Sequence, residues 1–285
     1  MRSRVMASAA LALVVVTVPL HAQGKGNGNG NGHKSSPPSR SPLPSPATGP
    51  AAGASPLAWL DDASLLAPGW MSVTVSTARW SGADLSEINF PIVEASVGLT
   101  RRFQVGASVP RIVGSADGTG PVGGVGTSYI SSKIALLTGG SGVKLAVSPV
   151  LEVLGEGAVQ ALAPGEGRTQ IGLPVSVELA QGPARVFAST GFFSHGAWFA
   201  GGGVGAQATP AIGVSLSFTR SWASDSTTGV SRNRQELSGG VSYFARPKIA
   251  VYGALGRTIA TTDDNGAGTT ISGGATFLLN PHLTK

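Results

Sequence analysis

The sequence predicts an all-β fold, namely a transmembrane up-and-down antiparallel β-barrel of about twelve strands. Three observations predict it. Apolar and polar residues alternate over most of the chain, charged residues are only 12% of it, and short turns alternate with longer connections. A soluble domain usually carries about twice this share of charge. A barrel wall that faces lipid carries little charge, because each Arg or Lys at mid-bilayer costs about 2–4 kcal/mol.

The first 22 residues have the order of a signal peptide. Arg2 and Arg4 give a basic start, residues 6–20 are almost entirely apolar, and cleavage is expected after Ala22. A membrane anchor is the alternative. It is disfavoured because a spanning helix needs about 20 apolar residues and a cleavage-like site follows here.

Residues 23–57 form a Gly/Asn-rich and then Ser/Pro-rich leader. This composition cannot bury enough apolar surface to offset the entropy of ordering, so we expect a disordered periplasmic segment. The barrel domain is expected at residues 58–285.

Strict alternation marks the strands of this domain. In residues 171–179, Ile and Leu or Val alternate with Gly, Pro, Ser and Glu, as they do when successive side chains point to opposite faces of a sheet. Helical spacing is not found. The expected strands are 69–80, 88–100, 102–113, 125–138, 143–155, 168–180, 184–193, 197–208, 210–222, 233–245, 248–260 and 268–280.

The connections support a membrane barrel. Tight turns follow strands 2, 4, 6, 8 and 10, whereas longer connections are expected after strands 1, 3, 5, 9 and 11, among them residues 114–124, 155–167 and 223–232. The tripeptide 194–196 after strand 7 is a short exception. Short periplasmic turns and long outer loops are typical of outer-membrane barrels. A soluble β-sandwich or lipocalin-like barrel is the alternative, but its wet face would hold little Lys or Glu.

Residues 97–110, VGLTRRFQVGASVP, resemble a known family. These are the outer-membrane barrels grouped as phenol-degradation meta-pathway proteins or general transporters, and residues 61–70 are similar to the start of their first strand. The resemblance covers about residues 60–281. It implies an outer-membrane channel for hydrophobic or small solutes, without catalytic residues. One departure concerns the final strand, since such barrels end on an aromatic residue and here Phe277 is followed by residues 278–285.

Charged residues that alternate with apolar ones are the candidate site. Alternation predicts that they face the lumen: Glu94, Lys133, Lys144, Glu152, Glu178, Arg185 and Glu236. They either set pore selectivity or pair with one another and plug the pore; the sequence favours neither. Aromatic residues near strand ends suit interfacial girdles: Trp70, Trp80, Phe192, Phe193, Trp198, Trp222, Tyr243 and Phe244.

Catalysis is not expected. A hydroxyl nucleophile needs a base, usually His, and after signal cleavage the chain has only His33, His195 and His282. No cofactor or metal is predicted, cysteine is absent, and no basic cluster indicates nucleic-acid binding. The predicted function is passive passage of a small solute through the cell outer membrane. Its partners are outer-membrane lipid and the barrel assembly machinery. The alternative is a structural or surface-interaction barrel closed by internal charge pairs, and an enzyme comes third.

Overall fold

The computed structural model describes residues 63–82, 85–116, 120–139, 142–155, 167–194, 196–223, 233–262 and 266–280. All of them belong to one compact unit, Pro42–Lys285. The described residues contain no helix long and apolar enough to cross a membrane. They form fifteen β-strands: β1 Met71–Ser81, β2 Leu85–Gly98, β3 Phe103–Ala116, β4 Gly120–Val125, β5 Ser128–Thr138, β6 Val143–Val147, β7 Val150–Val153, β8 Thr169–Gly172, β9 Val175–Gln181, β10 Ala184–Phe193, β11 Ala197–Thr209, β12 Ile212–Ala223, β13 Asn233–Arg246, β14 Ile249–Thr261 and β15 Thr269–Leu279.

These fifteen strands make twelve staves, a stave being one full crossing of the barrel wall. β4 and β5 both pair with β3 and form one stave. β6 and β7 both pair with β5, and β8 and β9 both pair with β10, so each of these couples is also a single stave. Pro149 and Pro174 lie at two of the interruptions, because proline has no N–H for the ladder.

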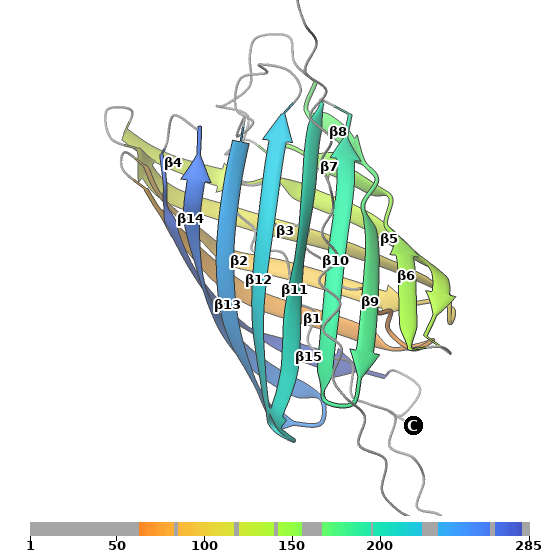
Figure 1. Cartoon of the computed structure of the whole chain (residues 1–285). Coiled ribbons are helices and arrows are strands. Elements are labelled where there is room, and N and C mark those ends of the chain that lie inside the picture. Colours follow the sequence, from red (N-terminus) through yellow and green to blue (C-terminus); the bar gives the residue numbers. More distant parts are fainter. Residues whose placement is uncertain are drawn as a thin grey trace, which may run out of the picture. The chain divides into compact units, whose positions relative to one another are not determined.

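The wall closes between its first and last strands (Figure 1). β1 pairs with β15 in continuous antiparallel register from Met71↔Leu279 to Ser81↔Thr269. Every other pairing of the described strands is antiparallel as well. The predicted fold, a closed barrel of twelve staves, is confirmed.

Two connections that the sequence predicts to be long are short, and both predictions are wrong. β1 and β2 are separated only by residues 82–84, and β3 and β4 only by residues 117–119. The segment 114–124 was expected as a loop because it is rich in glycine. Most of it is strand, with Arg111↔Val125 through Ala116↔Gly120 in register, because the backbone groups that make the ladder do not depend on the side chain.

The two ends of the barrel differ in their connections. Residues 182–183, 210–211 and 247–248 are two-residue turns at one end, which we call the short-turn end. The opposite end, the long-loop end, carries the connections 154–168 and 224–232. In Figure 1 the short turns between β9 and β10 and between β11 and β12 lie at the bottom.

The distribution of residues is the inverse of that in a soluble protein. Apolar side chains that point outward are exposed, such as Ile171 at 65% and Leu255 at 57%, whereas inward Ser176 and Thr258 are buried. Exposed apolar surface of this extent is unfavourable in water, but it suits hydrocarbon, where the closed ladder leaves no backbone edge unpaired. The outer face is therefore built for contact with lipid.

Candidate functional site: the inner face of the barrel

The charged residues singled out by the sequence lie on the inner face. Glu178 is buried while its neighbours Val177 and Leu179 are 40% and 49% exposed. The same alternation puts the others inside: Glu94 on β2, Lys133 on β5, Lys144 on β6, Glu152 on β7, Arg185 on β10 and Glu236 on β13. The structure brings two of them, Lys144 and Glu178, into direct contact and spreads the rest over five other strands.

Lys144 and Glu178 form an ion pair near the short-turn end. They are register partners on β6 and β9, and Lys144 Nζ lies 2.8 Å from Glu178 Oε1. The Glu178 side chain is only 4% exposed and that of Lys144 is 31% exposed. Of the two roles predicted for the inner charges, this pair therefore has the second, pairing within the lumen.

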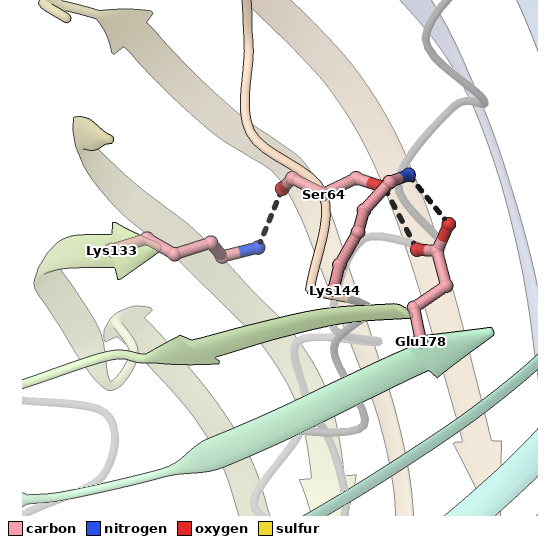
Figure 2. A network of polar contacts seen from close by, with 4 residues as sticks. All are labelled: Ser64, Lys133, Lys144 and Glu178. Carbon is pink, nitrogen blue, oxygen red and sulfur yellow. Dashed lines mark hydrogen bonds and ion pairs between the residues drawn. The ribbon is translucent and has the colours of Figure 1, made fainter. Parts of the chain in front are cut away.

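The chain just before β1 also lies against this inner wall, as Figure 2 shows. Ser64 Oγ donates to Glu178 Oε2 at 2.8 Å and accepts from Lys144 Nζ at 2.8 Å. Lys133 Nζ donates to the Ser64 carbonyl at 3.2 Å. We call these four residues the Ser64 clamp. It joins the pre-strand segment to three staves.

A second set of contacts holds the same segment against β3 and the end of β2. The Leu66 N–H donates to Gln104 Oε1 on β3 at 2.7 Å. The carbonyls of Leu66 and Ala67 pass so close to Gly98 that a Cβ there would collide with them. Ala63 is 1% exposed. Segment 63–67 therefore occupies part of the lumen at the short-turn end.

A tight turn explains why the segment lies inside. The Trp70 N–H donates to the Ala67 carbonyl at 3.0 Å, with Pro68 and Gly69 between them. Gly69 has φ 75°, so the turn has the proline and positive-φ glycine of a type II turn. It reverses the chain between segment 63–67 and β1. The position of this segment inside the lumen was not predicted from the sequence, although the Pro-Gly pair is a recognisable signal for the turn.

Several inward aromatic rings lie against glycines of the wall. A Cβ at Gly172, Gly191 or Gly203 would collide with the ring of Phe193, Phe199 or Phe187, respectively. Phe193 and Phe199 contact each other with ring centroids 6.2 Å apart, and both are buried. The glycines thus let large rings cover the wall with less intrusion into the lumen.

This arrangement corrects part of the predicted aromatic girdle. Phe193 is 2% exposed and faces inward, and Trp80 continues the inward series of Thr74, Ser76 and Ala78. Phe244 on β13 has the inward parity of Arg234 and Glu236 and is the register partner of buried Ala250. The girdle prediction is wrong for these three residues, because parity along a strand decides the face and position near a strand end does not. Other members do face outward, with these exposed fractions: Phe192 36%, Trp198 43% and Tyr243 49%.

Three of the remaining inner charges make local contacts. Ser108 Oγ donates to Glu94 Oε1 at 3.4 Å, and Ser238 Oγ donates to Glu236 Oε1 at 3.1 Å. The Arg185 guanidinium lies 5.3 Å from the centre of the Phe187 ring. The three histidines considered for catalysis, His33, His195 and His282, lie outside the described residues.

Comparison with solved structures identifies the same fold in outer-membrane proteins. The COG4313 outer-membrane channel from Pseudomonas putida F1 has a TM-score of 0.61 and 13% identity, and the alignment covers 76% of this chain and 98% of that chain. The NanC porin gives 0.53 and 11%, covering 72% and 98%. The translocator domain of the autotransporter NalP from Neisseria meningitidis gives 0.51 and 7%, covering 73% and 88%. No family model and no curated protein matches the sequence.

Proposed function

We propose that the chain is an outer-membrane channel for passive passage of small solutes. One observation carries the proposal: the barrel closes with an apolar outer face and an inner face rich in small polar residues. Such a wall is stable only in a bilayer and offers a polar path across it. The fold shared with the Pseudomonas putida channel and the NanC porin supports this assignment.

The inner face is suited to a solute path along the side of the barrel formed by β11 and β12. Most inward residues of β11 and β12 are small, among them Gly201, Gly203, Ser215 and Ser217; the larger ones on β11 are Phe199 and Gln207. The Ser64 clamp and segment 63–67 lie along β3, β5, β6 and β9 instead. We infer that the segment narrows the short-turn end without a counterpart on the β11–β12 side.

The setting of the channel is part of the proposal. The signal peptide of residues 1–22 directs export, assembly machinery inserts the barrel, and lipid surrounds the outer face. Residues 23–57 remain in the periplasm with the short turns. The resemblance of residues 97–110 to the phenol-degradation barrels favours small hydrophobic solutes, and no catalytic role is proposed for any residue.

A closed structural barrel is the second candidate. The Lys144–Glu178 pair favours it, because both side chains also bond to Ser64 and so hold a segment inside the lumen. In that case the clamp would fasten a permanent plug, and the inner charges would have no role in selectivity.

Planar-bilayer recording separates the two candidates. The refolded chain is expected to conduct in discrete steps, and Glu178→Gln is expected to enlarge them by loosening the clamp. Glu94→Gln is the matched control, since it removes the same charge from the inner face away from Ser64. A wild-type protein that is silent, in spite of heat-modifiable mobility on a gel, would establish the closed barrel.

A further inference from the structure

Buried polar atoms without a hydrogen bond gather at one place in the described part of the chain. They are Trp80 Nε1, Ser221 Oγ, Arg234 Nε and Nη2, and Thr258 Oγ1. Ser221, Arg234 and Thr258 are 1%, 5% and 3% exposed. Buried polar groups are nearly always paired, so four such residues require an explanation.

These four residues, which we call the donor cluster, come from β12, β13 and β14, which are adjacent, and from β1, which is separated from β14 by β15. Ser221 on β12 and Arg234 on β13 are register partners. The Arg234 guanidinium lies 5.3 Å from the centre of the Trp80 ring. The Trp80 indole lies over Gly268, whose carbonyl accepts the Thr258 N–H at 2.9 Å. The cluster is therefore continuous across β1, β12, β13 and β14.

The chemistry of the cluster is one-sided. Indole and guanidinium N–H groups only donate, and the two hydroxyls can donate as well. Their complement is a group that only accepts, with several lone pairs. A carboxylate, a phosphate or a sulfate meets this requirement, and hydrogen bonds between charged partners are the stronger ones.

Glu236 satisfies the cluster only in part. Its Oε2 is 3.7 Å from Arg234 Nη2, which is beyond hydrogen-bonding distance. Its other oxygen accepts from Ser238 at 3.1 Å. Arg234 thus has a nearby negative charge but no acceptor for its Nε and Nη2 hydrogens.

We propose that the donor cluster binds the oxyanion group of a solute at the long-loop end of the channel. The inference rests on the proposed function and adds the class of solute, small molecules that carry a carboxylate or a similar anion. The position fits capture from outside, because Trp80, Ser221 and Arg234 lie within three residues of the long-loop ends of their strands. Glu236 lowers the affinity and so keeps binding reversible.

Binding is tested on the refolded full chain in detergent by calorimetry, with benzoate as the probe and its neutral amide, benzamide, as the control. Benzoate is expected to bind and benzamide is not. Arg234→Gln is expected to weaken benzoate binding about tenfold or more, the effect of losing a charged hydrogen-bond partner. Trp80→Phe keeps an aromatic ring but removes the indole N–H together with the five-membered ring that carries it, and it is the second test if Arg234→Gln does not fold.

A charge variant gives an effect of opposite sign. Glu236→Gln should tighten benzoate binding several-fold, whereas Glu94→Gln, the same change elsewhere on the inner face, should leave it unchanged. Equal binding of benzamide, no binding of benzoate, or equal effects of the two Glu variants would overturn the proposal. Calorimetry does not require conduction, so a silent channel with intact benzoate binding would reject the proposed function and keep the site.

Discussion

Lys144 Nζ and Glu178 Oε1 form an ion pair at 2.8 Å in which only the glutamate is buried. The glutamate side chain is 4% exposed, whereas the lysine is 31% exposed and reaches solvent. Removing the lysine therefore leaves a buried carboxylate with the Ser64 hydroxyl as its partner. Removing the glutamate leaves an ammonium group that water can reach.

This asymmetry predicts unequal losses of stability. Lys144→Met is expected to lower the free energy of unfolding by about 1–2 kcal/mol more than Glu178→Gln does. The reason is that Lys144→Met leaves a buried charge without its counter-ion, whereas the charge left by Glu178→Gln is accessible to water. The double variant should lose less than the sum of the single losses. Urea unfolding in lipid vesicles measures all three. Lys248→Met, which removes an exposed lysine at the short-turn end, is the control, and equal losses for the two single variants would contradict the asymmetry.

The turn before β1 gives the second prediction. Gly69 has φ 75°, a conformation that costs a residue with a Cβ about 1–2 kcal/mol. Gly69→Val is expected to loosen segment 63–67 and to raise single-channel conductance. Gly182→Ala, at another positive-φ position in a two-residue turn, carries a similar strain without contact to the segment. A rise in conductance in both variants would show that the effect is general to the barrel.

Period-two alternation is enough to predict the twelve staves to within a few residues, because a single inward and outward choice repeats along each strand. Residues 184–193 were predicted as a strand and are β10. The sequence could not predict interruptions such as Ser148–Pro149, where the stave continues through bonds to the proline carbonyl. It also placed the ends of β3 and β4 wrongly, since glycine weakens a strand on average but a ladder can still pass through it.

The candidate site was predictable only in part. Alternation assigned Lys144 and Glu178 to one face. Their contact depends on the register between β6 and β9, and this register cannot be predicted from the sequence pattern. Segment 63–67 was missed because its contacts to Gln104 and Lys133 span long separations in sequence. The donor cluster was missed for the same reason, since its members come from four strands.

The two ends of the barrel predict which connections are reachable from outside an intact cell. A peptide tag inserted in the connection 224–232 is expected to be labelled by an antibody without permeabilisation. The same tag between Pro210 and Ala211, in a two-residue turn at the short-turn end, is expected to require permeabilised cells, because short turns are periplasmic. Reversed labelling would mean that the barrel is inserted with the opposite orientation.

The last prediction compares one introduced residue on the two faces of the wall. Val177 on β9 is 40% exposed and points outward, so Val177→Arg places a charge against lipid and is expected to cost about 2–4 kcal/mol if the position is near mid-bilayer. Ser217 on β12 points inward and has Gly203 and Ser238 as register partners. Ser217→Arg should therefore cost less than about 1 kcal/mol and shift the reversal potential across a salt gradient toward anions. Val177→Thr controls for the loss of the valine itself. Equal destabilisation by the two arginines would mean that β12 does not border the conducting path.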